Sequence, residues 1–239
     1  MKTQDYSFPI PPLDLSAYLV VGPENTKGRP VATIVKAAIT NGFTCVQIRS
    51  KVAGARELIS LCEEASTVIA EANLSNKVTL LVDDRLDVVY GARQKGIKVD
   101  GIHVGQSDIP PEICRELLGP NAIIGLSART TELLDYVKKC DTSSIDYFGA
   151  GPLHKTASKP DCGLDENGHF ATRSLSELSQ LHRISSLPVV VGGGVKEKDL
   201  PALKQTGVDG FFCISAVAGA DNPAQAAKQM SSLWKEAHK

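Results

Sequence analysis

The sequence predicts a single α/β domain folded as a (β/α)8 TIM barrel, and three observations lead to this prediction. Short runs rich in β-branched residues recur along the 239 residues. Each run is followed by a longer stretch that often carries apolar residues three and four positions apart, the helical spacing. Eight strand–helix pairs fit this length. A doubly wound sheet is the alternative, but no G-x-G-x-x-G turn follows the first run, as would usually open that fold.

The expected elements follow one another in order along the chain. Residues 31–42 and 55–72 have the clearest helical periodicity. Several helical patterns end in glycine, as helices often do: Gly42, Gly96 and Gly207. The expected strands are residues 17–21, 44–48, 78–82, 101–104, 122–126, 145–149, 188–191 and 210–214.

One domain accounts for nearly the whole chain. Residues 1–15 are expected to form an extended N-terminal arm, and residues 16–239 the barrel. Residues 155–173 form the longest insertion, and no linker, low-complexity tract or repeat interrupts the pattern.

Composition narrows the function. The 26 Lys and Arg residues nearly balance the 27 Asp and Glu residues, for a net charge of −1. A general nucleic-acid or membrane-surface binder usually has a basic excess, so neither partner is expected. The six cysteines are scattered without C-x-x-C spacing. We expect neither a secretory signal nor a membrane span, because the first residues lack an uninterrupted apolar region and no stretch approaches about 20 apolar residues. We therefore expect a cytoplasmic protein that acts on small molecules.

Polar residues gather where the expected strands end, which is where such barrels place their chemistry. The second strand sends Gln47, Arg49 and Lys51 to one side. Acidic residues follow the third and fourth strands. The full set at strand ends is Gln47, Arg49, Lys51, Asp83, Asp84, Arg85, His103, Gln106, Asp108, Ser127, residues 192–194 and Ser215.

Two carboxylates at adjacent strand ends predict a magnesium site. Either Asp84 or Asp108 alone would be interpreted as a helix cap. Together they suit Mg²⁺, which takes one or two protein carboxylates and leaves positions for phosphate oxygens and water. His103 lies within its strand and is interpreted as a hydrogen-bonded barrel histidine, while His154 and His169 receive no role.

Two anion sites are expected at this end of the barrel. Residues 192–194 and Ser215 follow the seventh and eighth strands, where backbone N–H groups often hold a monophosphate. Arg49, Lys51 and Lys159, with the metal, suit a diphosphate. Two phosphorylated substrates, one of them a diphosphate, indicate a reaction that displaces pyrophosphate.

Seven segments in order resemble the thiamin phosphate synthase family, also called thiamin phosphate pyrophosphorylase. The resemblance covers about residues 17 to 230. It is carried by VQIRSK, LLVDDRLDVV, GIHVGQSDIP, IIGLSART, DYFGAGPLHKTASKPD, VVVGGGV and ISAVAGADNP.

The resemblance implies a magnesium-dependent transferase. Hydroxymethylpyrimidine diphosphate would be joined to hydroxyethylthiazole phosphate through a pyrimidine carbocation, giving thiamin phosphate and pyrophosphate. It implies that Asp84 and Asp108 bind Mg²⁺, that Arg49, Lys51, Ser127 and Lys159 bind the diphosphate, and that Gln47 contacts the pyrimidine. It assigns the thiazole phosphate to Thr156, Ser158, Gly193, Ile214 and Ser215.

The chain departs from the family pattern at a few positions. Asp83 stands where the family usually has Asn. We interpret it either as an extra metal ligand or as a carboxylate that is turned away from the diphosphate. Ser158 replaces a Thr and keeps the hydroxyl. Arg129 stands where a His is common, and residues 162–172 form a longer connection, interpreted as either a lid or a surface excursion.

Other functions stay open on the sequence alone. One is a thiazole tautomerase-like paralogue, whose relatives tend to lose the diphosphate and metal residues. Another is a non-catalytic regulator that binds thiamin-pathway phosphates. A third is a sugar-phosphate isomerase or epimerase, for which Asp84 and His103 would be the acid–base pair. A homo-oligomer, or fusion to a pyrimidine kinase domain, is compatible with the sequence.

Overall fold

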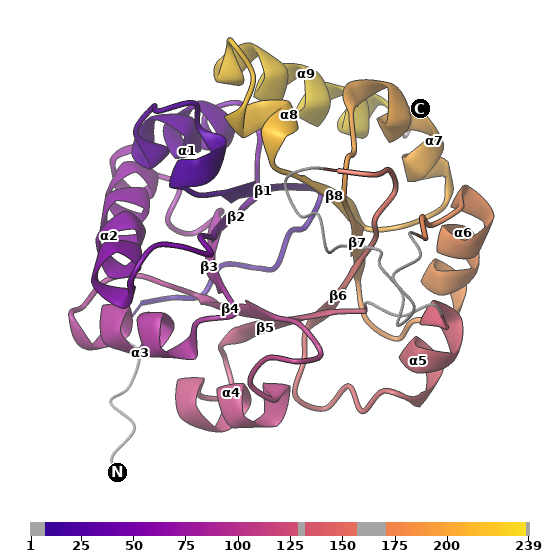
Figure 1. Cartoon of the computed structure of the whole chain (residues 1–239), viewed down its shortest axis with the longest axis horizontal. Helices are drawn as coiled ribbons and strands as arrows, with labels where there is room; N and C mark the ends of the chain where they lie inside the picture. Colours follow the sequence, from indigo (N-terminus) through magenta and orange to yellow (C-terminus); the bar gives the residue numbers. More distant parts are fainter. Residues whose placement is uncertain (1–7, 129–131, 157–170, 238–239) are drawn as a thin grey trace.

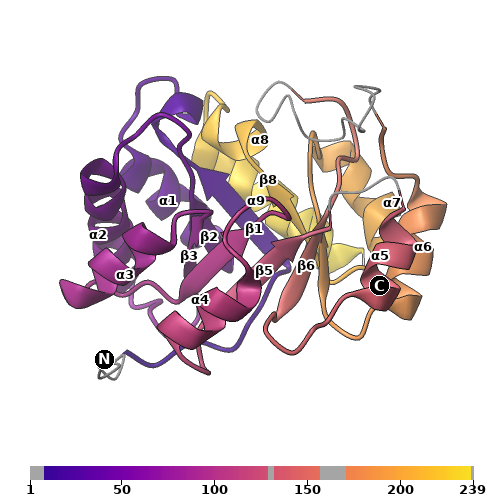
Figure 2. The ribbon, with the colours of Figure 1, turned by 60° about the horizontal axis from the view of Figure 1, so that its bottom comes forward.

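Eight parallel strands close into a barrel in the computed structural model, which describes residues 8–128, 132–156 and 171–237. Figure 1 looks along the barrel, with the strands as an inner ring and the helices around it. The first strand pairs with both the second and the eighth, and Figure 2 shows β1 and β8 side by side where the ring closes. The predicted (β/α)8 barrel is confirmed.

The strands lie where the sequence pattern placed them. β1 and β4 have the predicted bounds, and β6 begins two residues later than predicted. The strands are β1 (Ala17–Val21), β2 (Cys45–Ile48), β3 (Thr79–Asp83), β4 (Gly101–Val104), β5 (Ile123–Ser127), β6 (Tyr147–Ala150), β7 (Val189–Val191) and β8 (Gly210–Cys213).

The helices form the outer layer. Gly42, Gly96 and Gly207, the glycines predicted to end helices, follow α1, α3 and α7. The helices are α1 (Val31–Ile39), α2 (Ala55–Glu71), α3 (Leu86–Gln94), α4 (Pro111–Leu118), α5 (Leu133–Lys139), α6 (Leu175–Ile184), α7 (Leu200–Gln205), α8 (Ser215–Ala218) and α9 (Pro223–Glu236), with 3-10 turns η1 (Pro23–Asn25) and η2 (Glu197–Asp199).

Alternate residues of each strand serve two separate cores, as the period of two requires. In β1, Leu19 and Val21 pack outward in the large core between strands and helices. Tyr18 and Val20 point into the barrel and join a smaller cluster with residues of other strands. This inner cluster consists of Leu15, Tyr18, Val20, Cys45, Leu81, Ile123, Tyr147 and Val190.

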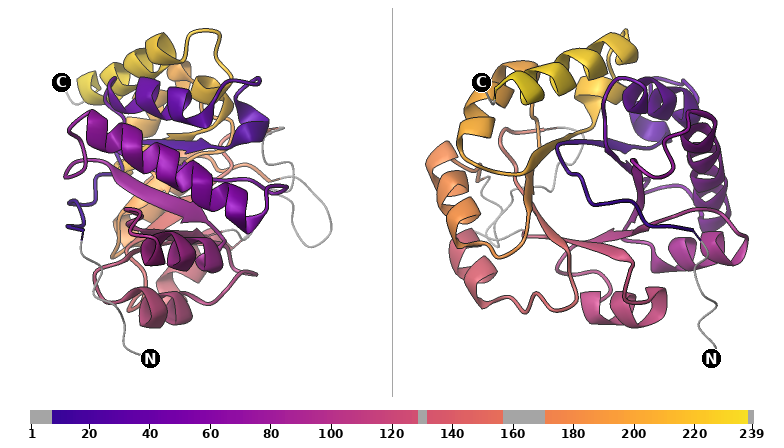
Figure 3. Two further views of the ribbon diagram at one scale, coloured as in Figure 1. Left: turned by 90° about the vertical axis from the view of Figure 1, so that its left-hand side faces the viewer. Right: turned by 180° about the vertical axis from the view of Figure 1, so that it is seen from behind.

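The segment before β1 covers one end of the barrel. Residues 8–16 have no regular secondary structure, and Figure 3 (right) shows this stretch crossing the opening of the ring toward β1. Leu15 is buried in the inner cluster, and Ile10 and Leu13 pack against it. The amino end of the barrel is therefore filled with apolar side chains.

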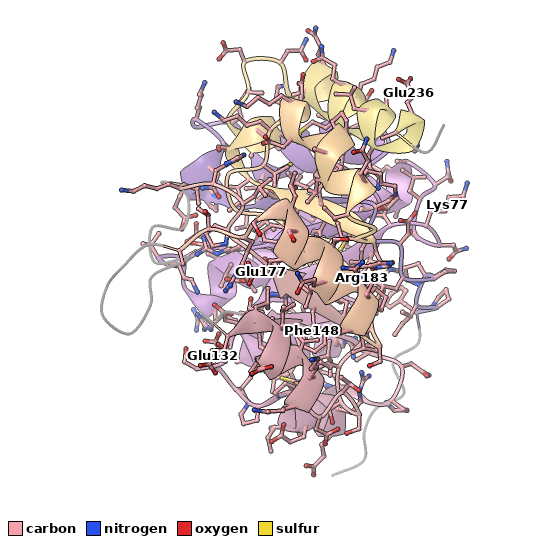
Figure 4. All side chains as sticks on the ribbon, turned by 90° about the vertical axis from the view of Figure 1, so that its right-hand side faces the viewer. Lys77, Glu132, Phe148, Glu177, Arg183 and Glu236 are labelled. Carbon is pink, nitrogen blue, oxygen red and sulfur yellow. The ribbon has the colours of Figure 1, made fainter. Side chains whose placement is uncertain are left out.

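The opposite end carries the loops that follow the strands. Figure 4 views the barrel from the side: Glu132, which lies between β5 and α5, is on the left, and Lys77, just before β3, is on the right. The left side is thus the carboxyl end of the strands, called the barrel mouth below. None of the helices in the described ranges is both long and apolar enough to cross a bilayer.

Candidate active site at the barrel mouth

Charged side chains from β2 and β3 meet at the barrel mouth. Arg49 and Asp83 are both buried, and the Arg49 Nε atom lies 3.1 Å from Oδ2 of Asp83. Lys51 donates a hydrogen bond to Asp84, and its Nζ atom lies 3.5 Å from Oδ2 of Asp83. Two of the three predicted diphosphate-binding cations are therefore brought together with one of the two predicted metal ligands, Asp84.

Arg49 has unused capacity to bind an anion. Its Nε atom is buried, and within the described residues it makes no hydrogen bond, although it is close to Asp83. A buried donor without an acceptor costs free energy. An oxygen of a bound diphosphate would satisfy it, so this observation fits the role that the sequence assigned to Arg49.

The opposite charges of Lys51 and Asp84 determine the protonation state of each side chain. Burial opposes the charged form of Lys51, but the hydrogen bond to Asp84 and the nearby Asp83 carboxylate outweigh it and raise the pKa of the lysine. Burial likewise opposes ionisation of Asp84, but its contacts with Lys51 lower the pKa of the carboxyl. Lys51 and Asp84 are thus a charged pair at neutral pH.

The backbone at Asp84 has an unusual conformation that aims its side chain. Asp84 directly follows β3 with a φ of 59°, in the left-handed region that Asp tolerates better than most residues. Its N–H donates to the carbonyl of His103 on β4 at 2.8 Å. Strained residues of this kind are often found at functional sites.

Asp108 completes the group from the loop after β4. Gly105 N donates to its Oδ2 at 2.8 Å, which fixes the carboxylate at the turn. Partial burial and the contact with the Asp84 carboxyl raise the pKa of Asp108. We call the five residues the mouth cluster: Arg49, Lys51, Asp83, Asp84 and Asp108.

The carboxyl pair fits a divalent cation. Asp84 and Asp108 interact side chain to side chain, and two carboxylates in contact repel each other unless a proton or a cation lies between them. Across the described residues, no group of three or more His, Cys, Asp or Glu side chains is arranged for a metal. A pair of carboxylates is what Mg²⁺ uses when phosphate oxygens and water supply the remaining ligands.

A residue that the sequence analysis missed holds the loop after β2. Glu24, in η1, accepts hydrogen bonds from Ser50 Oγ at 2.7 Å and from Lys51 N at 3.0 Å. Burial opposes the charge on Glu24, but these hydrogen bonds lower its pKa. Glu24 thereby fixes the backbone that presents Lys51. No motif indicated this, because the two residues lie on different loops.

A second group of residues lies after β7 and β8. Gly193 and Gly194 have φ values of 80° and 75°, the left-handed region open to glycine. A Cβ atom on Gly193 would lie 2.5 Å from Cβ of Pro152. Gly193 therefore requires glycine both for its conformation and for close packing. We call residues 192–194 the glycine cup.

The loop after β6 is joined to the glycine cup through its backbone. Leu153 N and His154 N donate to the carbonyls of Gly192 and Gly193 at 3.0 and 2.9 Å. His154 also lies 3.0 Å from the Asp199 carboxylate, measured from Nε2. Thr156, which the resemblance assigned to the thiazole phosphate, follows two residues later on this anchored loop.

The residues after β8 that were predicted to bind a phosphate lie at the start of α8. Ile214 is the N-cap of α8 and Ser215 its first residue, exposed at the mouth. The first hydrogen bond into α8 is donated by Val217 N to Ile214 O. The N–H groups that precede it face the end of the helix, where anions bind. Gly193, Ile214 and Ser215 thus lie at the ends of adjacent strands, as predicted.

The other predicted residues lie within the barrel or outside the described residues. Gln47 on β2 is buried, and Ser127 ends β5 at the mouth. His103 is hydrogen-bonded inside the barrel, as interpreted from the sequence. Ser158, Lys159, Arg129 and His169 lie outside the described residues, as do residues 162–170 of the longer connection.

The barrel and its mouth define a class of protein: a (β/α)8-barrel enzyme that acts on phosphorylated small molecules, with cations and carboxylates at one side of the mouth and a backbone cup at the other.

The chain belongs to the thiamine monophosphate synthase family, whose model matches residues 17–217. It is 36% identical to the thiamine-phosphate synthase of Vibrio parahaemolyticus over 200 residues, 84% of this chain and 89% of the relative. It is also 36% identical to that of Corynebacterium efficiens over 220 residues, 92% of this chain and 95% of the relative. The solved thiamine phosphate pyrophosphorylase from Pyrococcus furiosus superposes with a TM-score of 0.76 at 28% identity, covering 94% of this chain and 98% of that one.

Proposed function

We propose that the chain is a thiamine-phosphate synthase. It joins hydroxymethylpyrimidine diphosphate to hydroxyethylthiazole phosphate and releases pyrophosphate. The observation that carries this proposal is the mouth cluster, in which Arg49 and Lys51 pair with Asp83 and Asp84 and Asp108 lies against Asp84. The names of the relatives support the same reaction.

The reaction needs no protein nucleophile. The bond between the pyrimidine methylene and the diphosphate oxygen breaks, and the electron pair leaves with pyrophosphate. The thiazole nitrogen then donates its lone pair to the methylene carbon and forms the new C–N bond. The aminopyrimidine ring stabilises the carbocation between these steps, so the protein contributes position and charge.

The mouth cluster binds the diphosphate in this proposal. Arg49 and Lys51, with Lys159, neutralise the charge that grows on the leaving pyrophosphate. Ser127 donates a hydrogen bond to it. Asp84 and Asp108 hold Mg²⁺, which when bound neutralises phosphate oxygens. Asp83 keeps Arg49 in place through their ion pair. This positioning role was not among the two interpretations from the sequence, an extra metal ligand or a carboxylate turned away from the diphosphate.

The second substrate binds across the mouth. The glycine cup, Ile214 and Ser215 hold the thiazole phosphate through backbone N–H groups, and Thr156 and Ser158 add hydroxyls. Gln47 contacts the pyrimidine, for which its amide can both donate and accept. The hydrogen bonds between the loop after β6 and the glycine cup support binding of both substrates beside this loop.

We also propose a cytoplasmic location, supported by free cysteines at five described positions: Cys45, Cys62, Cys114, Cys140 and Cys213. A homo-oligomer and a fusion to a pyrimidine kinase domain stay predictions.

The test is synthesis of thiamin phosphate from the two substrates, read as thiochrome fluorescence after oxidation. The wild-type chain should give a signal that depends on Mg²⁺. Asp108→Ala should lower it by roughly a hundredfold or more, as expected when a charge-stabilising group is lost. The matched control is Asp141→Asn, an exposed carboxylate before β6, which should behave as wild type. A folded wild-type chain without signal would refute the proposal.

A further inference from the structure

Side chains from five strands form a continuous chain of hydrogen bonds inside the barrel. Gln47 Nε2 donates to the Tyr18 hydroxyl at 2.7 Å, and the Tyr18 and Tyr147 hydroxyls are 3.0 Å apart. Tyr147 OH lies 2.8 Å from Nδ1 of His103, and Nε2 of His103 lies 2.9 Å from Ser127 Oγ. The chain thus links two residues of the proposed substrate site, Gln47 and Ser127, across the ring seen in Figure 1.

The barrel interior is shaped around this chain. A Cβ atom on Gly125 of β5 would lie 2.2 Å from Cζ of Tyr147 and 2.4 Å from Nδ1 of His103. A Cβ on Gly149 of β6 would lie 2.9 Å from Cε1 of His103. The absence of side chains at these two positions leaves room for the Tyr147–His103 pair.

Both phenols stay protonated, so each has one hydrogen to donate. Tyr18 and Tyr147 are buried. Burial raises the pKa of each well above its ordinary value, and each is raised further by the charge of neighbouring groups. Each hydroxyl can therefore accept one hydrogen bond and donate another.

The direction in which these hydrogen bonds are donated follows from Gln47, the first residue in the series. The Gln47 nitrogen has only hydrogens to offer, so the Tyr18 oxygen accepts and its own hydrogen is directed to Tyr147. Tyr147 then donates to Nδ1 of His103, which must be unprotonated. The ring proton is left on Nε2 and is donated to Ser127 Oγ.

We propose that His103 is a positioning residue for the diphosphate: the chain from Gln47 holds it as the Nε2–H tautomer, and its donation to Ser127 Oγ turns the serine hydroxyl hydrogen toward the substrate. A diphosphate accepts hydrogen bonds and donates none at neutral pH, so a Ser127 hydroxyl directed at His103 would face it with lone pairs only. The role of His103 in catalysis rests on the proposed function, whereas the position of its ring proton does not.

The tautomer can be measured without substrate. In protein labelled with ¹⁵N-histidine at neutral pH, the His103 ring should carry its proton on Nε2, with Nδ1 unprotonated. Tyr147→Phe, which keeps the ring and removes the hydroxyl, should abolish this preference. A proton on Nδ1, or on both nitrogens, in the wild-type chain would overturn the proposal, because the chain of hydrogen bonds would run in the other direction.

Two replacements of His103 separate positioning from packing. A Gln amide N–H can take the place of Nε2–H and still reach Ser127, whereas Asn matches Nδ1 and loses this contact. We expect His103→Asn to lower kcat/KM for the diphosphate substrate roughly ten- to hundredfold, as for a lost hydrogen bond to a charged group. His103→Gln should retain most of the activity, and the KM for the thiazole phosphate should be unchanged in both.

A double-variant cycle decides whether His103 acts through Ser127. In a Ser127→Ala background, His103→Asn should have little further effect, since the hydroxyl that it positions is gone. Equal losses in both backgrounds, or equal losses for Asn and Gln, would indicate packing alone and overturn the proposal.

If the wild-type chain makes no thiamin phosphate, the same variants are compared by calorimetry for binding of pyrophosphate with Mg²⁺. The affinity for pyrophosphate should be highest in the wild-type protein, lower in His103→Gln and lowest in His103→Asn. Equal affinities would overturn the positioning role independently of the reaction.

Discussion

Charged residues at the barrel mouth are paired across neighbouring strands. Arg49 lies against Asp83, and Lys51 against both Asp83 and Asp84. This pairing explains how the chain accommodates an aspartate at position 83, where the family usually has Asn. The added negative charge is buried next to two cations, so its repulsion toward a diphosphate is largely compensated.

Asp83→Asn should keep or raise activity. An asparagine retains an oxygen close to Arg49 and removes one negative charge near the diphosphate, so kcat should stay within roughly threefold of wild type. Without substrate the melting temperature should fall, because Arg49 loses its counter-charge, and pyrophosphate should restore it. Steady-state kinetics and thermal unfolding measure both effects. Asp84→Asn is the comparison and should lose most activity; a large loss in Asp83→Asn would contradict the assignment.

Asp108→Asn should separate stability from magnesium binding. The pKa of Asp108 is raised, so this group favours the native state below the ordinary carboxyl pKa of about 4 and loses that contribution as the pH rises through its folded value. At neutral pH the metal-free variant should therefore be at least as stable as wild type. Its melting temperature should no longer respond to Mg²⁺ with pyrophosphate.

The wild-type chain should show the corresponding pH dependence. Mg²⁺ requires the ionised carboxylate, so its affinity should fall as the pH drops through the raised pKa of Asp108. Calorimetric titrations at several pH values would measure this. An unchanged affinity across that range, or a marked destabilisation of Asp108→Asn, would contradict the assignment of this residue.

At the scale of the element, the strands of the barrel divide their residues between two environments. Outward residues pack against helices, whereas inward residues change from apolar at the amino end to polar at the mouth. Glycines in β5 and β6 face inward where the rings of Tyr147 and His103 need space. The residues of β5 and β6 are therefore selected by packing inside the barrel as well as by strand pairing.

Gly125→Ala tests this fit. The new methyl group would overlap the Tyr147 ring and His103, and such overpacking costs about 1–3 kcal/mol. The melting temperature should fall by about 2–4 °C for each kcal/mol. Gly54→Ala is the comparison for a methyl group added in open space, because nothing lies within 4 Å of its Cβ position. Gly54 is the N-cap of α2, so a loss of up to about 1 kcal/mol is expected there. Equal melting temperatures for the two variants would show that the interior can rearrange around the methyl group.

At the scale of the whole molecule, the two ends of the barrel have separate tasks. The amino end is closed by apolar residues of the segment before β1, among them Leu15. The mouth carries the charges, the glycine cup and the loops that follow the strands. In such a barrel, residues at the amino end support stability, while those at the carboxyl end carry function.

Leu15→Ala should therefore lower stability without changing substrate binding. Leu15 is 4% exposed, and removing a buried leucine side chain typically costs about 2–5 kcal/mol. Both KM values should match wild type at a temperature where the variant is folded. Leu175→Ala, at a leucine that is 41% exposed, should change stability little. A change in KM for Leu15→Ala would contradict the division between the two ends.

Much of this molecule can be predicted from local pattern. Residues 17–21 form a strand with the predicted bounds because five consecutive apolar residues suffice to specify a buried strand. Residues 101–104 also have the predicted bounds, although His103 within them is polar. The shared location of the carboxyl ends of the strands also follows from the sequence, since parallel strands joined by helices all end at the same side of the barrel. Arg49, Lys51, Asp83, Asp84 and Asp108 could therefore be placed at the mouth before any contact was known.

Only the tertiary structure shows which of these residues are in contact and which side chain donates each hydrogen bond. Glu24 holds the loop of Lys51, and His103 joins Tyr147 to Ser127, through contacts between residues far apart in the chain. Such contacts depend on the tilt and register of strands around a closed ring. Local pattern in the amino-acid sequence therefore specifies the barrel and the residue types at its mouth. The partners of each side chain are set only when the ring closes, because closure brings together residues that are distant in the chain.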